Sequence, residues 1–524
     1  MGLRTRWRRL AARTTGSTQR LPLGGRSRRP HIAEQSIREV IELAARIGEA
    51  MLALGESADD VTDAIARVCR TFGVESHIDL TFTSILVTHD GTDRLAGVSV
   101  LRVVGSPTAD YGRLSRVLAI ERALSATRIG TSVSDPGIGS EERDEVREVL
   151  EATHAQLDEA LSAPHRVRRW MVTLLLAVLA GAVAVLLGGG PAIVAIAAAT
   201  TVLIDSASRI LSAWGLPVFF RQAAGAAIAT TVAVALSAAI PGLPVEFTTL
   251  PPALVVASGV VVLLAGGTVV GAANDAINGY PITASGRILE VLLLTVGIVA
   301  GIGGVLDLAR RLDITLTLDD IPANPAPLYA QVLAAGIASA AWAAASHAGR
   351  LTAVVSALAG AGGLAVFATA VAAGASNPAA AAIAATAVGF AASLVSRRTD
   401  IPLVAITVCG IVPLLPGLTI YRGMLAVVTG SSETDGGQLL LQAAMTGLSL
   451  AAGVTLGEII ARRIRRPAKR RAPGPDPSAP SESAQRSSTD SDDDAPTESV
   501  EMHDAPSAAD DTDAAIERRS EASG

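Results

Sequence analysis

A block of long apolar runs between residues 170 and 462 constrains the fold of this chain more than any other feature. The runs consist mainly of Ala, Val, Leu, Ile and Gly, and each is close to the roughly 20 residues that an α-helix needs to cross about 30 Å of hydrocarbon. They lack the polar and apolar alternation that a transmembrane β-barrel requires. Hydrophobic residues make up 50% of the chain, aromatic residues 3% and charged residues only 18%, and the mean hydropathy is positive, which together exclude an ordinary soluble composition. The sequence therefore predicts a polytopic α-helical membrane protein.

Hydropathy predicts about ten transmembrane helices in this block. The second of them is short, which leaves open that it is tilted or paired with its neighbour. The predicted spans are 171–188, 191–207, 217–240, 252–273, 286–306, 328–347, 351–373, 377–395, 401–428 and 438–461.

The distribution of arginine orients these spans, because cytoplasmic connections carry an excess of positive charge. If the amino terminus is inside, the outer connections hold only Arg310 and Arg311, close to several aspartates. Both termini are therefore predicted to be cytosolic. The inner segments then hold Arg166, Arg168, Arg169, Arg209, Arg221, Arg287, Arg350, Arg397, Arg398 and the cluster from Arg462 to Arg471.

Five segments are expected along the chain. The arginine-rich amino end has no continuous apolar core and is not predicted to be a secretory signal peptide. The carboxyl end has almost no aliphatic residues, which predicts disorder. Cys69 and Cys409 are the only cysteines, which excludes a disulfide framework or a cysteine metal site. The predicted segments are a disordered basic arm (1–33), a cytosolic α/β domain (34–165), membrane repeat 1 (166–312), membrane repeat 2 (313–466) and a disordered acidic tail (467–524).

Two helices open the predicted α/β domain. Apolar residues at helical spacing predict a first helix that Gly55 ends. Ser57 and Asp60 have the spacing of a capping box, which predicts the start of a second helix that Gly73 ends. The predicted buried stripe of that second helix is Val61, Ile65, Val68 and Phe72.

Strands follow these helices, because the apolar period changes to two in HIDLTFTSILV (77–87). This stretch predicts one strand with one wet face. A second strand at 95–104 and helices at about 110–126 and 141–163 complete the domain. The predicted buried face of the first strand carries Ile78, Leu80, Phe82 and Leu86.

Histidine and aspartate beside these strands are compatible with a metal or general acid/base site. His77 and Asp79 share one face of the first strand, and His89 and Asp90 occupy the turn after it. Neither a third ligand cluster nor a glycine-rich phosphate loop accompanies them, so a solvated strand face is the preferred interpretation.

The membrane region contains a short internal repeat. GVVVLLAGGTVV (259–270) aligns with GIVPLLPGLTIY (410–421), and the alignment pairs Gly266 with Gly417. One copy lies in the fourth predicted span and the other in the ninth, which divides the region into two halves of five spans each. An odd number of spans per half gives the halves opposite orientations. This is the inverted-repeat plan of many secondary transporters.

The second copy of the repeat contains its own helix breakers, Pro413, Pro416 and Gly417. Breakers free backbone amides and carbonyls, which survive at membrane depth only where protein or a wet cavity surrounds them. Two broken helices of opposite sense would bring helix ends and polar groups to one central site. Such a site suits a small zwitterion, with amides and Arg422 for its carboxylate and carbonyls and a carboxylate for its ammonium.

Each predicted translocation residue also has a plainer interpretation. The prolines and Gly417 can kink a helix for packing, and Arg422 with Tyr421 can anchor the outer interface. Asn274 and Asp275 can cap a helix end, whereas Glu290 with Arg287 and Glu458 with Arg462 can form interfacial pairs. Small residues along the helices indicate close helix packing, so no cofactor is expected. The predicted substrate or translocation residues are Gly266, Asn274, Asp275, Glu290, Pro413, Pro416, Gly417, Tyr421, Arg422 and Glu458.

Several long motifs resemble the threonine/serine exporter family of actinobacteria and related bacteria over residues 35 to 465. The motifs are GESADDVTDAIARVCRTFGV, HIDLTFTSILVTHDG, DYGRLSRV, GLPVFFRQAAGA, NDAINGYPITASGRILE and PLLPGLTIYRGMLA. The resemblance implies a ten-span carrier of the cytoplasmic (inner) membrane with a cytosolic amino-terminal domain, which exports threonine and serine by means of the proton motive force. It transfers no substrate-binding residue to this chain.

The partners that this resemblance implies are a small amino acid, protons and the lipid bilayer, with no nucleic acid. Coupling to protons requires a protonatable carboxylate, for which Asp275, Glu290 and Glu458 are the candidates. No nucleotide-binding loop of the Walker type is present, which argues against a pump driven directly by ATP.

Two other classes of function stay open at this point. A membrane-tethered enzyme would use its α/β domain on a small-molecule substrate, and metal-dependent turnover by isolated residues 34–165 would favour it. A passive channel would use the broken helices as a filter, and transport unaffected by an uncoupler would favour that.

Overall fold

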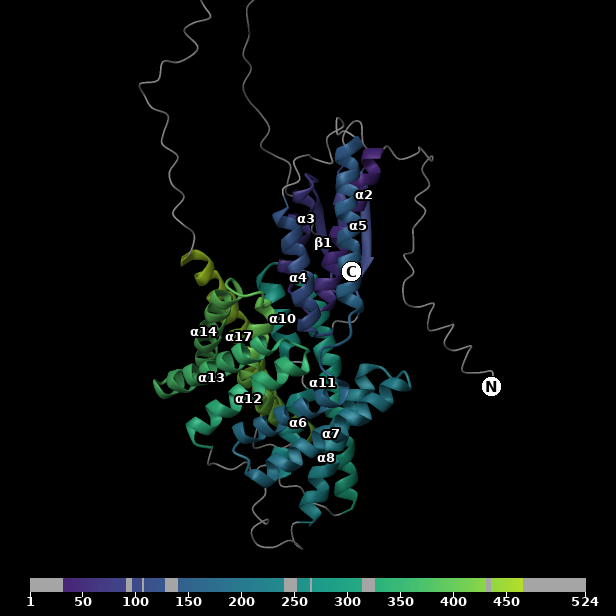
Figure 1. Cartoon of the computed structure of the whole chain (residues 1–524). Coiled ribbons are helices and arrows are strands. Elements are labelled where there is room, and N and C mark those ends of the chain that lie inside the picture. The colour runs from purple at the N-terminus through teal and green to yellow at the C-terminus, as the bar shows by residue number, and fades with distance from the viewer. Residues whose placement is uncertain are drawn as a thin grey trace, which may run out of the picture. The chain divides into compact units, whose positions relative to one another are not determined.

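A computed structural model of the protein describes residues 32–90, 97–105, 108–127, 140–239, 252–263, 266–312, 326–429 and 435–464. All of these residues belong to one compact unit. Figure 1 shows an amino-terminal group of helices and strands next to a bundle of apolar helices. The predicted acidic tail and nearly all of the predicted basic arm lie outside the described residues.

In the amino-terminal domain, two helices pack directly against a small sheet, and two further helices pack on those helices. Its core consists of apolar side chains from α2, α3, α4 and the sheet, among which Ile37, Ile41, Ile65, Phe72 and Leu114 are fully buried. The three strands are antiparallel and lie in the order β1-β2-β3. The elements are α2 (Ile32–Ala53), α3 (Ala58–Thr71), β1 (His77–Leu80), β2 (Ser84–His89), β3 (Val98–Val103), α4 (Tyr111–Ala126) and α5 (Ser140–Ser162).

Helix α3 forms as its sequence predicts. The Ser57 side chain accepts a hydrogen bond from the amide of Asp60 at 3.2 Å, and its hydroxyl donates to the Asp60 carboxylate at 2.8 Å. These bonds satisfy backbone donors that a helix start otherwise leaves free. Gly55 and Gly73 have φ values of +96° and +69°, the left-handed backbone that ends a helix at low cost for glycine. The predicted stripe of Val61, Ile65, Val68 and Phe72 is buried.

The single strand predicted over 77–87 is wrong, because the chain reverses between Leu80 and Ile85 and forms the β1–β2 hairpin. The Thr81 amide donates to the Ser84 carbonyl at 2.8 Å, and the Ser84 amide donates to the Thr81 hydroxyl at 3.1 Å. These local bonds compete with a continuous strand. The reversal shifts the buried face, so that Ile85 and Val87 are buried in place of Leu86.

The membrane region is confirmed as helical and multi-pass. Within the described residues, eight helices are long and apolar enough to cross a bilayer. They are α6 (Arg169–Leu186), α7 (Pro191–Ala213), α8 (Val218–Ala239), α11 (Pro281–Arg311), α12 (Leu328–Ala345), α13 (Arg350–Ala372), α14 (Asn377–Ser396) and α17 (Gly436–Ile464).

Helix α7 corrects the prediction of a short second span, because it runs past residue 207 to Ala213. Its polar residues have partners close by. The Asp205 carboxylate accepts a hydrogen bond from the Thr173 hydroxyl at 2.6 Å and lies 3.3 Å from the Arg209 guanidinium. The i, i+4 pair therefore lies inside the helix and does not end it.

The ninth predicted span is divided into α15 (Leu403–Ile411), the 3-10 turn η3 (Val412–Leu414) and α16 (Gly417–Thr429). The fourth predicted span contains α9 (Pro252–Leu263) and α10 (Gly266–Ile277), and the two residues between them lie outside the described part of the chain. The aligned glycines, Gly266 and Gly417, are the first residues of α10 and α16. The break that the repeat predicts is therefore present in the second half, and in the first half it stays a prediction.

Equivalent helices of the two halves make equivalent contacts. α6 packs on α7 as α12 packs on α13, and α8 packs on α11 as α14 packs on α17. α10 packs on α11 as α16 packs on α17. Between the halves, α6 contacts α12, and the reciprocal pairs α10–α17 and α16–α11 are both in contact.

One face of the bundle carries the amino-terminal domain. The Thr283 hydroxyl at the start of α11 donates to the Leu80 carbonyl at 3.3 Å. The Tyr111 amide donates to the Ser346 carbonyl between α12 and α13 at 3.0 Å. Arg122 pairs with Asp400 between α14 and α15 at 2.9 Å. These three connections are among those that the arginine distribution assigns to one side of the membrane.

Glycine allows α14 and α17 to pack closely. A Cβ atom at Gly453 would collide with the carbonyl of Ala382, and one at Gly457 would collide with the carbonyl of Thr386. Small residues at a helix–helix contact let the two backbones approach closely. The van der Waals packing that results is one of the forces that hold helices together in lipid.

We expect Gly457→Leu to lower the thermal unfolding temperature of the detergent-purified protein by several degrees. Overpacking typically costs ~1–3 kcal/mol, and here the obstacle is backbone rather than a movable side chain. Gly304→Leu on α11 is the matched control, because a Cβ atom at that position meets nothing within 4 Å. Equal unfolding temperatures for the two variants would contradict this packing.

Candidate functional site

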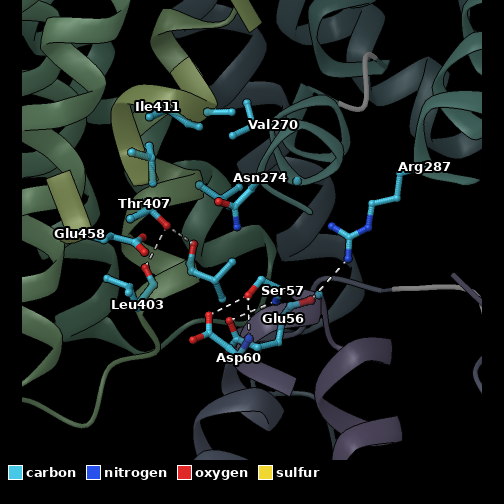
Figure 2. A pocket seen from close by; sticks show the side chains of 16 residues that line it. Glu56, Ser57, Asp60, Val270, Asn274, Arg287, Leu403, Thr407, Ile411 and Glu458 are labelled. Carbon is cyan, nitrogen blue, oxygen red and sulfur yellow. Dashed lines mark hydrogen bonds between the residues drawn. The ribbon is translucent and has the colours of Figure 1, made fainter. Parts of the chain in front are cut away.

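A cavity of about 80 Å³ lies between α10, α15 and α17, where the two halves of the membrane region meet (Figure 2). The loop between α2 and α3 forms one of its walls. The cavity is well below the roughly 300 Å³ of a drug-sized site, so it suits a few water molecules or a small solute. Its apolar walls are Val, Leu, Ile and Ala side chains, and its polar lining residues are Glu56, Ser57, Asp60, Asn274, Arg287, Thr407 and Glu458.

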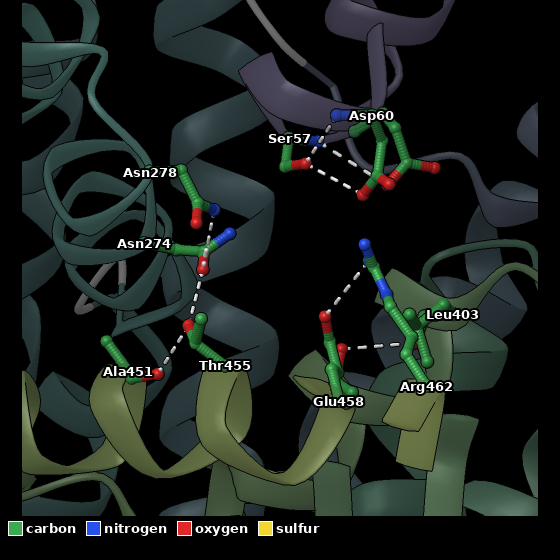
Figure 3. Close-up of polar contacts among 11 residues, drawn as sticks. Ser57, Asp60, Asn274, Asn278, Leu403, Ala451, Thr455, Glu458 and Arg462 are labelled. Carbon is green, nitrogen blue, oxygen red and sulfur yellow. Dashed lines mark hydrogen bonds and ion pairs between the residues drawn. The ribbon is translucent and has the colours of Figure 1, made fainter. Parts of the chain in front are cut away.

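Polar side chains on the membrane wall connect the two halves. The side-chain amide oxygen of Asn274 on α10 accepts a hydrogen bond from the Thr455 hydroxyl of α17 at 2.7 Å, as Figure 3 shows. The Thr407 hydroxyl donates to the Leu403 carbonyl within α15 at 3.1 Å. Glu458 lies 3.8 Å from Arg462 one turn along α17, so it has a weak partner beside the cavity. The pair predicted between Glu458 and Arg462 is therefore present.

The loop that closes the cavity contributes further carboxylates. Figure 3 shows Ser57 and Asp60 facing Glu458 and Arg462 across a gap. Glu56 is 4% exposed, and its burial, together with the neighbouring Asp60, raises the pKa of its carboxyl from 4.5 to about 8. Glu56 is therefore mainly protonated at neutral pH while the loop occupies this position.

Asp275 fastens this loop to the membrane helices. Its carboxylate is 1% exposed and lies 3.2 Å from the Arg287 guanidinium. Its other oxygen accepts a hydrogen bond at 3.2 Å from the amide of Ala58, the first residue of α3. The positive end of the α3 dipole and the arginine thus both neutralise Asp275. Gly271 makes room for this arrangement, because a side chain there would collide with the Arg287 guanidinium.

Three of the predicted translocation residues lie at or beside the cavity. Asn274 and Glu458 line it, and Asp275 is buried next to it. Arg287 pairs with Asp275 and not with Glu290 as predicted. The plainer interpretation of Asp275 as a cap of a helix end has support, because its carboxylate accepts the first amide of α3.

The other predicted residues lie elsewhere and stay untested. Pro413 is in η3 and Pro416 directly precedes α16, so both mark the helix break without lining the cavity. Glu290 is half-buried on α11 and Arg422 is exposed on α16. The side chain of Tyr421 lies outside the described residues. Gly266 and Gly417 begin α10 and α16.

Sequence reasoning missed Glu56, Asp60, Arg287 and Thr407 as members of this site. The stretch GESADD was interpreted as a capping box, although it carries three acidic residues directly after a helix-ending glycine. That run is the one local signal that favours a polar role. Nothing local connects it with Arg287, which lies more than 200 residues away along the chain.

The histidines and aspartates of the β1–β2 hairpin do not gather into a metal site within the described residues. His77 lies 3.3 Å from Asp90, and both side chains are largely exposed. The His89 ring is bonded to the Glu75 carbonyl at 2.6 Å. A solvated strand face remains the interpretation of this region.

Comparisons with known proteins match nearly the whole described chain. A family model described as "Putative threonine/serine exporter" matches residues 42–133 and 143–309, and one described as "Threonine/Serine exporter, ThrE" matches residues 331–460. The chain belongs to the threonine/serine exporter family. It is a membrane-embedded amino-acid transporter and not an enzyme, so the resemblance predicted from the sequence motifs is confirmed and the tethered-enzyme alternative is excluded.

Relatives of this exporter are similar over most of their length. The "Threonine/serine exporter" of Corynebacterium glutamicum is 37% identical over 434 residues, which cover 82% of this chain and 83% of the relative. The "Probable threonine/serine exporter" of Mycobacterium tuberculosis is 32% identical over 461 residues, which cover 86% of this chain and 82% of the relative. No solved structure matches the exporter.

We expect Asp275→Asn to release the α2–α3 loop from the cavity. The substitution removes the partner of the buried Arg287, and an unpaired buried charge typically costs about 3–5 kcal/mol. A cysteine reporter, Thr407→Cys, should then react with a small maleimide at least tenfold faster than in the otherwise native protein. Both native cysteines are buried and are left in place.

The matched control for this release is Arg122→Ala, which removes an ion pair at the same domain boundary. Arg122 and Asp400 are 48% and 89% exposed, and such a pair contributes little. The reporter should therefore react at its native rate. An unchanged rate in the Asp275→Asn protein would show that this carboxylate does not hold the loop.

The raised pKa of Glu56 predicts that the loop is held less tightly at high pH. Its carboxyl pKa is about 8 in the cavity and 4.5 when released, so docking is fully favoured below pH 4.5 and is weakened as the pH rises through 8. Above pH 8 the Glu56 charge is opposed by Asp60 and Glu458, and Arg287 offsets only part of this repulsion.

Hydrogen exchange of the amides of residues 55–60, corrected for intrinsic rates, measures this effect in the full-length protein. Exchange should accelerate between pH 6 and pH 9, and Glu56→Gln should remove most of the acceleration. Glu151→Gln on α5, where the side chain is 71% exposed, should leave it unchanged. The same acceleration in the Glu56→Gln protein would contradict the assignment.

Proposed function

We propose that this exporter moves threonine and serine outward across the cytoplasmic membrane in exchange for protons. The substrates follow from the names of the relatives, which are similar over most of this chain. The observation that carries the mechanism is the cavity itself, which half-helices of both repeats line and in which Glu458 offers a carboxylate.

The two halves act as inverted repeats in this proposal. Each half has three long helices, two shorter helices and one very long helix, in the same order. The reciprocal contacts α10–α17 and α16–α11 support a pseudo-two-fold relation between them. Such repeats allow a central site to open alternately to the two sides. The contact between α9 and α16 supports a closed outer side in this state.

The amino-terminal domain and both termini are assigned to the cytosol. The arginine excess supports this orientation, and the domain contacts the connections that this excess places inside, so it lies on the same side as they do. The cavity then lies on the cytosolic side, where an exported amino acid enters. The α2–α3 loop must leave it before a substrate can bind.

The chemistry of the cavity suits a small hydroxylated zwitterion. Leu403 and Val404, at the first turn of α15, line it, and Pro402 at the N-cap makes no side-chain capping bond. The amide end of α15 therefore favours a carboxylate. Glu458 favours the ammonium group, and Asn274 offers a hydrogen bond to a hydroxyl.

Proton exchange supplies the driving force in this scheme. A zwitterion has no net charge, so one exchanged proton contributes about 2.3 kcal/mol per 100 mV and about 1.4 kcal/mol per pH unit. Glu458 is the carboxylate that we assign to the proton, because Asp275 is already neutralised by Arg287 and the end of α3.

We expect Glu458→Gln to abolish stimulation of threonine transport by a pH gradient in proteoliposomes, while threonine counterflow continues with a raised threonine KM because Glu458 also faces the ammonium group. Counterflow requires no net proton movement, so it separates coupling from binding. Asn274→Ala should raise the threonine KM about tenfold with coupling intact, since a lost hydrogen bond to a polar solute costs about 1–3 kcal/mol.

Glu290→Gln distinguishes the two glutamates, because Glu290 does not line the cavity. Coupling should survive this substitution. Loss of coupling in Glu290→Gln together with its survival in Glu458→Gln would identify Glu290 on α11 as the proton-binding residue instead. Wild-type threonine flux that ignores both a pH gradient and an uncoupler would instead favour the passive channel.

A further inference from the structure

Three side chains with metal-ligating atoms converge where the amino-terminal domain meets the membrane region, away from the cavity. They are Asp110 at the N-cap of α4, His165 between α5 and α6, and His347 between α12 and α13. One ligand atom from each lies within 4.8 Å of the other two. The three residues come from three distant parts of the chain, so tertiary structure brings them together.

The geometry of this cluster is well defined. The His165 Nδ1 atom lies 2.9 Å from the Asp110 carboxylate, and the His165 and His347 rings are stacked with centroids 4.6 Å apart and planes at 23°. Asp110 is 4% exposed, and its other oxygen accepts a hydrogen bond from the Arg113 amide at 2.9 Å. The carboxylate is therefore held in place by the helix that it caps.

His347 has one feature that stacking does not explain. Its Nδ1 atom is buried and has no hydrogen-bond partner, which is uncommon for a buried polar atom. Its backbone φ of +59° has a local cause, because the chain ends α12 with His347 in the left-handed conformation. The His347 amide donates to the Ala344 carbonyl at 3.1 Å, and the Ala348 amide donates to the Ala343 carbonyl at 3.0 Å.

Burial lowers the pKa of His347, against the opposing effect of Asp110. A neutral imidazole is the form that binds a metal ion, because metal and proton compete for the same nitrogen. The main opposing charge is Arg113, whose guanidinium lies 3.6 Å from the Asp110 carboxylate and also donates to the Ala163 carbonyl at 2.9 Å. The Arg113 guanidinium therefore has a hydrogen-bond partner, the Ala163 carbonyl, besides the Asp110 carboxylate.

We propose that Asp110, His165 and His347 bind one divalent transition metal ion of the zinc class. Two imidazoles and a carboxylate match the ligand preference of Zn²⁺, and three protein ligands leave the fourth position to water. Ligand atoms around tetrahedral zinc lie about 3.3 Å apart, so a small closure of this cluster completes the geometry. The bound ion fastens α4 and the α5–α6 segment to the α12–α13 connection.

Metal content of the full-length protein, purified in detergent without a polyhistidine tag, tests this site. The protein is stripped with a chelator, equilibrated with Zn²⁺ and desalted, and its zinc is then measured by mass spectrometry. We expect about one zinc ion per chain. His165→Ala and His347→Ala should each weaken Zn²⁺ binding at least tenfold. His154→Ala, which removes a half-buried histidine paired with Arg46 instead, should leave it unchanged.

Replacement of zinc by Co²⁺ gives a readout that does not depend on variants. Tetrahedral coordination by nitrogen and oxygen should produce visible absorption bands that disappear as the pH falls and the histidines are protonated. Wild-type protein without these bands, or with no more zinc than the His165→Ala/His347→Ala double variant, would overturn the proposal. If a histidine variant does not fold, the wild-type cobalt spectrum decides.

Discussion

The buried carboxylate of Asp275 is the interaction on which the arrangement of the site depends. A charge removed from water is strongly unfavourable unless it is paired, and Asp275 is paired twice, with Arg287 of α11 and with the amide end of α3. The ion pair with Arg287 joins α10 to α11 across their short connection. The hydrogen bond from the amide end of α3 joins α10 to the amino-terminal domain. The position of that domain therefore affects how well the Asp275 charge is neutralised.

In the proposed transport cycle this coupling involves the amino-terminal domain. While α3 is seated on Asp275, Glu56 and Asp60 form part of the wall of the cavity. The same carboxylates face Glu458, so the number of protons in the cavity and the position of the loop influence each other. Our proposal that the cavity loads from the cytosol requires this loop to withdraw before a solute enters.

Much of the fold could be predicted from the sequence, because its causes are local. Bilayer thickness sets the length of apolar helices. Pro413 and Pro416 separate α15 from α16 because proline interrupts a helix. Ser57 and Asp60 cap α3 through bonds three residues apart. The hairpin at Thr81 and Ser84 was missed because local hydroxyl bonds overrode a favourable alternation. The cavity was only half predicted, since the contact of Ala58 with Asp275 spans 217 residues and leaves no periodic signal.

The central claim is that a substrate replaces the α2–α3 loop between α10, α15 and α17. Electron cryomicroscopy of the full-length exporter in lipid nanodiscs with saturating threonine tests it most directly. The account predicts density for the amino acid between Asn274 and Glu458, with residues 55–60 withdrawn from the cavity. Threonine bound elsewhere while the loop stays seated on Asp275 would contradict it.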